Sequence, residues 1–206
     1  MEKKIIISDP TLRDGNHAIG HQLSTDQIAS YCMAADAAGI DIVEVGHGNG
    51  LGASSLQLGE SATPDDIALK VARANLKKSK LGIHIIPGFA TIERDLEPAL
   101  NLGVDVVRVA SHCSEADITE RHIGFARRRR AEVWGCLMMS HMISPIQLLE
   151  QAKKMESYGA EGKRNDRQKN DQAEHQNQRD TPLVRPACSI AGPAFHRLAT
   201  PWMTQR

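Results

Sequence analysis

The chain contains, at residues 5 to 17, the stretch Ile5-Ile6-Ile7-Ser8-Asp9-Pro10-Thr11-Leu12-Arg13-Asp14-Gly15-Asn16-His17. A short apolar run is followed directly by a cation, a carboxylate and an imidazole. In α/β barrels the functional side chains follow the carboxyl ends of the strands. The stretch therefore predicts a first strand within residues 4 to 8 and a functional site behind it.

Four further apolar, β-branched runs follow, and all are too short for a typical helix. Each is apolar at successive positions, which is typical of parallel strands buried on both faces. The five predicted strands are Ile5–Ile7, Ile42–Val45, Leu81–Ile86, Val104–Val109 and Val133–Met138.

Segments with helical spacing lie between these runs. A capping box at residues 24 to 27 predicts a helix that buries Ile28, Tyr31, Cys32 and Ala35. Thr63 as a cap, with Pro64 at the first helical position, predicts a second helix that buries Ile67, Val71 and Ala74. Weaker patterns predict helices over 92–102 and 115–128. A last helix begins at Ser144 and Pro145, carries Leu148, Ala152 and Met155 on one face, and stops at Gly159.

Strand and helix alternate five times, which leaves two α/β architectures: a doubly wound sheet and a TIM barrel. No G-x-G-x-x-G motif follows the first strand, whereas polar residues follow several strands. This pattern favours a TIM (β/α)8-type barrel. The barrel is expected to be incomplete, with about five of eight units, in a partial barrel domain over residues 1–162. The polar residues are Arg13, Asp14, His17, His47, Ser111, His112, Ser140 and His141.

Residues 163–206 form an aberrant tail that we expect to be disordered. Residues 163 to 180 contain a single apolar residue, Ala173, and a stretch of that composition cannot bury a strand. One hypothesis is that the chain is truncated or frameshifted after about residue 162. Arg127 to Arg130, four adjacent like charges, is either a solvated basic helix end or a second trace of a shifted frame.

Composition narrows the class of partner. The 25 basic and 25 acidic residues balance, so there is no electrostatic argument for nucleic acid or membrane, and a small molecule or another protein is expected. The four cysteines form no C-x-x-C pair, which argues against a zinc cluster or a disulfide framework. The amino terminus shows no signal-peptide core. A cytoplasmic location is the natural prediction.

Three residues of the opening stretch have suitable chemistry for catalysis. The Arg13 guanidinium suits a substrate carboxylate or keto oxygen and the enolate formed from it. Asp14 offers oxygen to a divalent cation, which needs further ligands, and His17 is the candidate general base. The alternatives without a catalytic role are a surface salt bridge between Arg13 and Asp14 and a solvated His17.

Other histidine and cysteine residues are weaker candidates for the functional site. The three histidines His47, His112 and His141 could line the same site at the carboxyl ends of the strands, or could merely pack behind it. The glycine-rich segment 46–52 is expected to be a flexible loop and not a P-loop, because it lacks the Gly-Lys-Ser/Thr ending. Cys113 and Cys136 are expected to be small buried residues.

Four motifs together resemble the 4-hydroxy-2-oxovalerate aldolase family, within the HMG-CoA lyase-like, or DRE-TIM metallolyase, superfamily. A histidine at position 17 followed by Ala18 favours this branch over relatives that have Gln there. The motifs are residues 7–18, residues 43–51, residues 108–117 and residues 137–142, and the resemblance covers residues 4 to 162.

The resemblance implies cleavage of 4-hydroxy-2-oxovalerate to pyruvate and acetaldehyde in the breakdown of aromatic compounds. Arg13 would stabilise the pyruvate enolate and bind substrate, His17 would deprotonate the C4 hydroxyl, and Asp14 would contact substrate and ligate a divalent metal. Mn²⁺ is the expected metal, with Mg²⁺ or Co²⁺ possible, and an acylating acetaldehyde dehydrogenase is the expected partner.

This sequence lacks the family's His-x-His metal ligands, and His175 and His196 stand in no matching motif. The chain is therefore predicted to be inactive or very weak. Two alternatives stay open. One is another superfamily member acting on CoA thioesters, similar to isopropylmalate or homocitrate synthase or to HMG-CoA lyase. The other is a non-catalytic fragment that binds the dehydrogenase.

Overall fold

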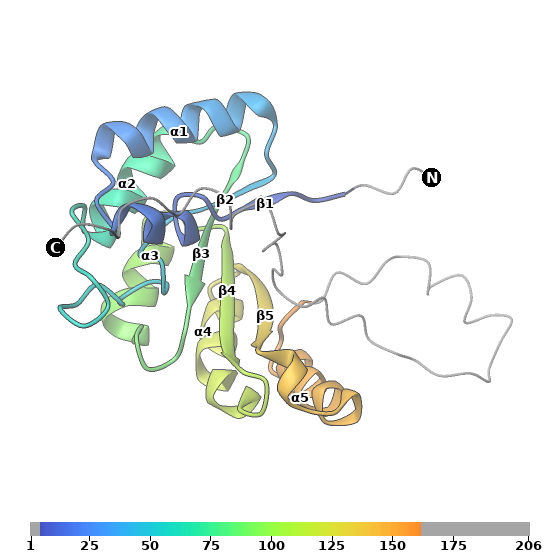
Figure 1. Ribbon diagram of the computed structural model, residues 1–206. Helices are drawn as coiled ribbons and strands as arrows, with labels where there is room; N and C mark the ends of the chain where they lie inside the picture. Colours follow the sequence, from blue (N-terminus) through green and yellow to red (C-terminus); the bar gives the residue numbers. More distant parts are fainter. Residues whose placement is uncertain (1–4, 162–206) are drawn as a thin grey trace, which may run out of the picture.

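The computed structural model describes residues 5–161, and the predicted tail lies outside them. Five parallel strands form one sheet in the order β1-β2-β3-β4-β5. A doubly wound sheet reverses its strand order, whereas a barrel adds each strand beside the one before it. The order confirms an incomplete TIM barrel, here called the half-barrel, whose strands lie side by side in Figure 1. The strands are Ser8–Asp9 (β1), Ile42–Glu44 (β2), Lys80–Ile85 (β3), Val106–His112 (β4) and Glu132–Met138 (β5).

A helix follows each strand, and α1 and α2 pack on each other in Figure 1. Short 3-10 or π turns precede several of these helices. The α-helices are Thr25–Ala38 (α1), Asp65–Asn75 (α2), Glu97–Asn101 (α3), Glu120–Arg128 (α4) and Pro145–Ser157 (α5); the short turns are Asp14–Ile19 (η1), Ile92–Leu96 (η2), Ala116–Thr119 (η3) and Ser140–Met142 (η4). None of the helices in residues 5–161 is long and apolar enough to cross a membrane.

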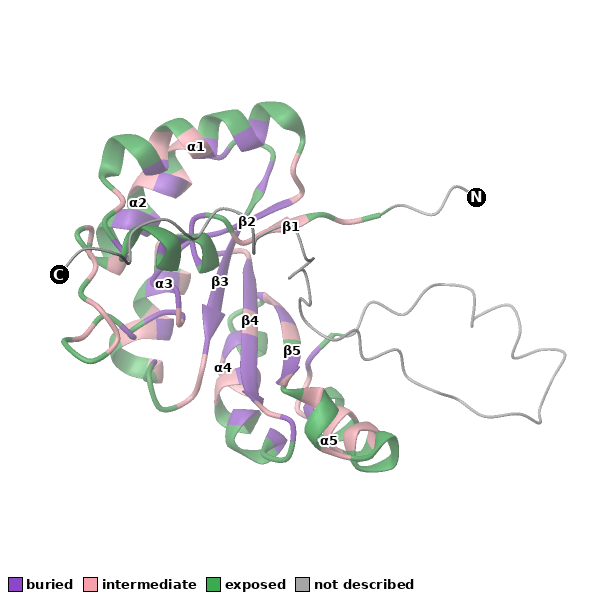
Figure 2. Cartoon of the chain, in the orientation of Figure 1, coloured by how far each residue is buried: buried purple, intermediate pink, exposed green. Residues whose placement is uncertain are grey.

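The core lies between the outer face of the sheet and the helices, where Figure 2 shows the buried positions. Side chains alternate along each strand, so one set faces the helices and the other faces the barrel interior. Val43, Ile83 and Val107 belong to the core. Glu44, His84 and Arg108 occupy the alternate positions. The expectation that both faces are apolar is therefore wrong at these three positions of the inner face.

The first strand is shorter than its sequence predicts. Ile5 is 77% exposed and Ile7 is 51% exposed, and the paired residues are Ser8 and Asp9. Within residues 5–161, β1 has β2 as its only neighbour in the sheet. An apolar run at a sheet edge has nothing on its free side to bury it, so the predicted buried strand is wrong at 5–7.

Two helices begin at the predicted capping boxes. Ser24 and Ser144 each accept a hydrogen bond from the backbone N–H three residues on, and Gln27 and Gln147 bond back. The predicted buried face of α1 is confirmed, with Tyr31 partly buried. In α5, Met155 is buried and Leu148 and Ala152 pack against the core. Gly159, at φ +106°, follows the end of α5 as predicted.

The predicted buried face of α2 is wrong at Ile67 and Ala74, whereas Val71 is partly buried and packs against the core. Ala68, Leu69 and Ala72 are the buried residues, while Ile67 is 41% exposed. Pro64 is the N-cap, and the Thr63 hydroxyl donates to the Leu23 carbonyl at 2.7 Å instead of capping the helix. Small alanines on the buried face let α2 approach α1 closely, which a hydrophobicity pattern does not predict.

The helix predicted over 92–102 is split into η2 and α3. Pro98 has no N–H to donate and its ring crowds the preceding turn, so the first part adopts the wider π geometry. The arginine run ends α4 at Arg128, and Arg129 pairs with Glu97 at 2.8 Å. These contacts agree with the reading of the run as a basic helix end.

Candidate functional site

The polar stretch behind β1 folds into a tight turn that leads into η1. The Pro10 carbonyl accepts hydrogen bonds from the N–H groups of Arg13 (3.0 Å) and Asp14 (2.7 Å). Arg13 is the N-cap of η1, which carries Asp14, Asn16 and His17. One turn of helix therefore presents the three predicted site residues within five positions, beside the carboxyl end of β1.

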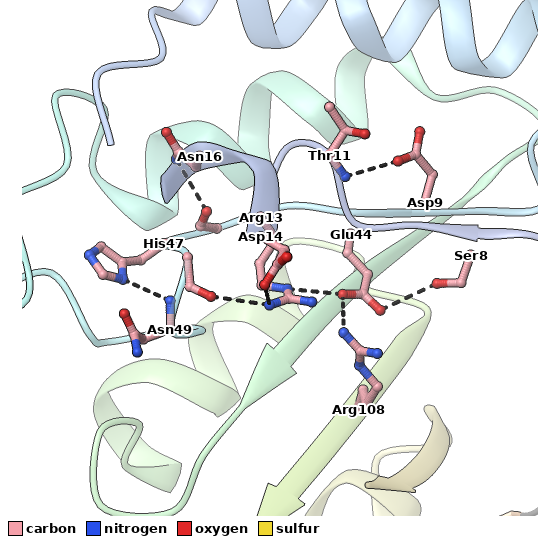
Figure 3. Close-up of polar contacts among 12 residues, drawn as sticks. Ser8, Asp9, Thr11, Arg13, Asp14, Asn16, Glu44, His47, Asn49 and Arg108 are labelled. Atoms are coloured by element: carbon pink, nitrogen blue, oxygen red, sulfur yellow. Dashed lines mark hydrogen bonds and ion pairs between the residues drawn. The ribbon is translucent and has the colours of Figure 1, made fainter. Parts of the chain in front are cut away.

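Arg13 is buried, only 8% exposed, and its guanidinium is held on several sides (Figure 3). Nε donates to Glu44 Oε2 at 3.1 Å, while NH1 donates to Asp14 Oδ1 at 2.9 Å and to the Gly48 carbonyl at 3.1 Å. The salt bridge with Asp14 is present, but the Arg13 guanidinium itself is buried and not at the surface. A guanidinium fixed this way is a preorganised cation at the mouth of the half-barrel.

Glu44 is the centre of this arrangement, and sequence reasoning missed it as a functional residue. Its Oε2 also accepts from Arg108 NH2 at 2.6 Å, and its Oε1 accepts from the Ser8 hydroxyl at 3.3 Å. Two guanidiniums thus share one buried carboxylate, as Figure 3 shows. The available signal was a charge inside an apolar run: Glu44 between Val43 and Val45.

Asp14 differs from its neighbour because its side chain is 63% exposed. One oxygen is engaged by Arg13, which leaves the other free to meet a ligand. A protein metal site needs several such ligands, and residues 5–161 contain no group of three or more His, Cys, Asp or Glu side chains placed to hold an ion. The residues that the structure describes therefore do not make the metal site that the resemblance implies.

His17 is exposed on η1, next to two other histidines. Its ring centroid lies 4.9 Å from that of His21, edge to face, and 6.2 Å from that of His47. A Cβ on Gly48 would lie 2.4 Å from His17 Nε2, so the imidazole fits only because that position is glycine. The glycine-rich segment thus makes room for the candidate base.

His47 is fully buried, and both of its ring nitrogens are engaged. Nδ1 accepts from the Asn49 N–H at 3.1 Å, and Nε2 lies 3.0 Å from the Gly59 carbonyl, to which it donates. Only a neutral imidazole protonated at Nε2 satisfies both partners. His47 is therefore a packing residue behind the mouth, stacked on His21 with ring centroids 3.8 Å apart.

The other two candidate histidines lie after later strands. His112 ends β4, and its Nδ1 lies 2.7 Å from the Ser114 hydroxyl. His141 is exposed on η4, after β5. Among residues 5–161, neither His112 nor His141 makes a hydrogen bond with Arg13, Asp14 or His17.

His84 was also missed by sequence reasoning. It is 5% exposed, lies on the inner face of β3 opposite Arg108, and its Nδ1 has no hydrogen-bond partner in the described part of the chain. Burial, followed by the positive charges of Arg108 and Arg13, lowers its pKa to about 2. His84 is thus a neutral polar group beside two cations.

The glycine-rich segment 46–52 is packed, not open as expected of a flexible loop. Most of its residues are buried, and the Gly52 N–H donates to Asp65 Oδ2 at 2.9 Å. The cysteines behave as expected, because Cys113 and Cys136 are buried. Burial, and to a lesser degree Asp36, raises the pKa of Cys32 to about 11, which makes its thiol a poor nucleophile.

Known proteins match this half-barrel closely. A 4-hydroxy-2-oxovalerate aldolase of Pectobacterium atrosepticum is 62% identical over 161 residues, covering 78% of this chain and 47% of that protein. A protein of the same name from Spirochaeta aurantia is 64% identical over 157 residues, covering 76% of this chain and 46% of its own length. The chain thus spans about half the length of the curated relatives it matches.

Solved structures agree on the fold. The carboxyl transferase domain of Rhizobium etli pyruvate carboxylase superposes with a TM-score of 0.61 at 14% identity, over 77% of this chain and 30% of that one. The model of the HMGL-like family matches residues 4–162. The chain belongs to the HMGL-like family.

Proposed function

We propose that the half-barrel carries the amino-terminal part of an aldolase site that cleaves 4-hydroxy-2-oxovalerate to pyruvate and acetaldehyde. The observation that carries the proposal is the buried Arg13 guanidinium, held by Glu44 beside an exposed carboxylate and an exposed imidazole on the same turn. The names of the two relatives above, at 62% and 64% identity, support this substrate.

Retro-aldol cleavage assigns a separate task to each side chain. His17 accepts the proton of the C4 hydroxyl, the C3–C4 bond breaks, and its electron pair moves into the enolate of pyruvate. Acetaldehyde leaves with the new carbonyl. Arg13 donates hydrogen bonds to the enolate oxygen, where negative charge develops. Return of a proton to C3 completes pyruvate.

The rigidity of Arg13 supports this assignment. A guanidinium that must reorient as charge develops stabilises the transition state less, because reorientation costs free energy. A guanidinium that is already fixed avoids this cost. Glu44 holds Nε, and the Gly48 carbonyl holds NH1. Glu44 and Arg108 are therefore proposed as positioning residues for Arg13.

A divalent metal, first Mn²⁺ and alternatively Mg²⁺ or Co²⁺, is proposed for the complete barrel, with Asp14 as one ligand. Its exposed oxygen supports this role. The further ligands would come from the half that the relatives have beyond the matched region. Without them, the 206-residue chain is proposed to be inactive or very weak.

The cellular setting is likewise proposed. Acetaldehyde is reactive, so an acylating acetaldehyde dehydrogenase that consumes it is the partner proposed for the complete aldolase. The proposed location is the cytoplasm, and the proposed pathway is aromatic-compound catabolism.

A chimera tests the activity. Residues 1–161 are joined to the carboxyl-terminal half of the Pectobacterium relative, and pyruvate release from 4-hydroxy-2-oxovalerate is measured with added Mn²⁺. We expect activity from the chimera and none from the 206-residue chain. His17→Ala and Arg13→Lys in the chimera should each lower kcat by about 100-fold or more, because each removes a group that acts in the transition state.

The alternatives have distinct outcomes in the same experiment. A folded chimera that turns over CoA thioesters but not 4-hydroxy-2-oxovalerate would overturn the aldolase proposal in favour of the acyltransferase or lyase branch. Release of pyruvate by the 206-residue chain alone would contradict its proposed inactivity. Co-purification of the inactive chain with the dehydrogenase would favour a binding fragment.

A further inference from the structure

A small cavity lies beside η1, and Leu12 and Asn16 are among its lining residues. Its volume is about 10 Å³, and its lining residues come from the η1 turn, the segment leading to α2, and the core. Apolar side chains, among them Leu12, Ile28 and Val45, form part of its wall. The rest of the wall is polar, and Asn16, His21 and Ser61 contribute to it.

Three buried polar atoms of this wall lack partners. Within residues 5–161, Asn16 Oδ1, His21 Nε2 and Ser61 Oγ make no hydrogen bond. Asn16 is 6% exposed and His21 is 5% exposed. A buried polar atom without a partner costs free energy, and nearly all such atoms in proteins are satisfied by protein groups or by ordered water. Three of them around one cavity indicate a shared ligand.

The three side chains are held in place by other contacts. Asn16 Nδ2 donates to the Gly46 carbonyl at 3.4 Å. His21 has a left-handed backbone, φ 63°, fixed by its N–H to the Asn16 carbonyl (2.9 Å) and by its carbonyl, which accepts from the Ala62 N–H (2.9 Å). The Ser61 N–H donates to Ser54 Oγ at 2.9 Å.

We propose that this cavity binds one ordered water molecule, which bridges Asn16, His21 and Ser61. The volume is close to the smallest that holds a water molecule, and three polar partners is the usual number for a buried one. Asn16 Oδ1 accepts one water hydrogen, and the Ser61 hydroxyl and His21 Nε2 each donate or accept as needed. A larger ligand does not fit a cavity of about 10 Å³.

The water has a positioning role for the proposed base. It ties Asn16, inside η1, to Ser61 in the segment before α2, and it fixes the ring plane of His21. That ring stacks on His47 and meets His17 edge to face, 4.9 Å between centroids. Burial lowers the pKa of His21. His21 and the water thus support His17 from behind.

A crystal structure of the 206-residue chain at a resolution that shows waters is the direct test. We expect one ordered water within hydrogen-bond distance of Asn16 Oδ1, His21 Nε2 and Ser61 Oγ. An empty cavity, or a side-chain rearrangement that pairs these atoms with one another, would overturn the proposal.

Stability measurements test it independently. If the water is present, Ser61→Ala should lower the folded-to-unfolded ratio about tenfold, whereas Ser30→Ala on the exposed face of α1 should not lower it. If the cavity is dry, Ser61 loses only an unsatisfied hydroxyl, and Ser61→Ala should leave the ratio unchanged or raise it. The sign of the change therefore decides between the two states.

A double substitution tests whether the ligand is shared. Asn16→Leu fills the cavity and displaces the water, so Ser61→Ala in that background should change the ratio less than about twofold. Additive effects would overturn a shared water. None of these readouts involves catalysis, so the water site can be confirmed or overturned independently of the proposed aldolase activity.

Discussion

The two ends of the half-barrel differ in how their buried polar side chains are hydrogen-bonded. At the amino ends of the strands, Asp36 Oδ1 accepts three backbone N–H groups, from Lys77 (2.9 Å), Lys78 (2.7 Å) and Ser79 (2.7 Å). The Ser79 hydroxyl in turn donates to the Ile40 carbonyl at 2.6 Å. Backbone groups satisfy these side chains, and the cluster joins α1 to the start of β3.

At the carboxyl ends, side chains from distant segments hold one another. Arg13, Glu44 and Arg108 come from three separate segments and form one buried charged group. Three buried polar atoms near this charged group lack a partner in residues 5–161: Asn16 Oδ1 in η1, and His84 Nδ1 and Arg108 Nε at paired positions of β3 and β4.

This difference separates a cluster that stabilises the fold from one that is available to a ligand. A satisfied cluster such as that of Asp36 stabilises the fold and has nothing left to offer a ligand. A cluster with unpaired donors and acceptors is costly in the folded state, and such groups are retained where a water, substrate or ion meets them. Both arguments support the carboxyl ends as the place of the proposed chemistry.

The largest effect is expected from breaking the charged group. Glu44→Gln removes the buried charge that the Arg13 and Arg108 guanidiniums share and should lower the free energy of unfolding by about 3 to 5 kcal/mol. Urea denaturation measures it. The matched control is Asp66→Asn, which breaks an exposed 2.9 Å pair with Lys70 and should cost no more than about 0.5 kcal/mol. Equal effects would show that the buried group is no more important than a surface pair.

A smaller effect should come from the close packing behind the site. A Cβ on Gly50, at φ +101°, would lie 2.7 Å from the His84 carbonyl oxygen, whereas a Cβ on Gly88, at φ +107°, meets nothing within 4 Å. Gly88→Ala should cost about 1 kcal/mol from backbone strain alone, and Gly50→Ala about 2 to 4 kcal/mol. Thermal unfolding compares the two, and similar losses would mean that the segment yields to accommodate a methyl group.

The smallest effect is expected at the opposite end, and it depends on pH. Hydrogen bonds from the backbone of Ser79, Lys78 and Lys77 lower the pKa of Asp36 to about 2. A lowered folded-state pKa stabilises the protein above the unfolded value, and this contribution is lost as pH falls toward 2. Asp36→Asn should therefore be less stable than the wild type at pH 6, and the difference should shrink below pH 4. A difference independent of pH would exclude the charge as its cause.

Some features followed from local sequence alone. The capping boxes at Ser24 and Ser144 set the starts of α1 and α5, because the contacts involved span three residues. The alternation of apolar runs and helices predicted parallel β/α units, and polar residues after the strands favoured the barrel. Arg13, Asp14 and His17 were predicted together because they are neighbours in the chain.

Other features required the tertiary structure. The pattern at Ile5 and Ile7 predicts a buried strand. Whether an apolar run is buried depends on its neighbours in space, and in the described residues β1 has a neighbouring strand on one side only. Glu44 and Arg108 are 64 positions apart, and their pairing depends on the register of β2, β3 and β4. No local pattern reports such a register.

The sequence by itself thus determined the family, the order of the elements and the three side chains of the opening turn, because these depend on short-range chemistry. Only the tertiary structure decided that Arg13 is a buried, fixed cation and not half of a surface pair, that His17 owes its space to Gly48, and that Asn16, His21 and Ser61 meet at one cavity. The reason is physical: burial and hydrogen-bond satisfaction are set by what the folded chain brings alongside each group.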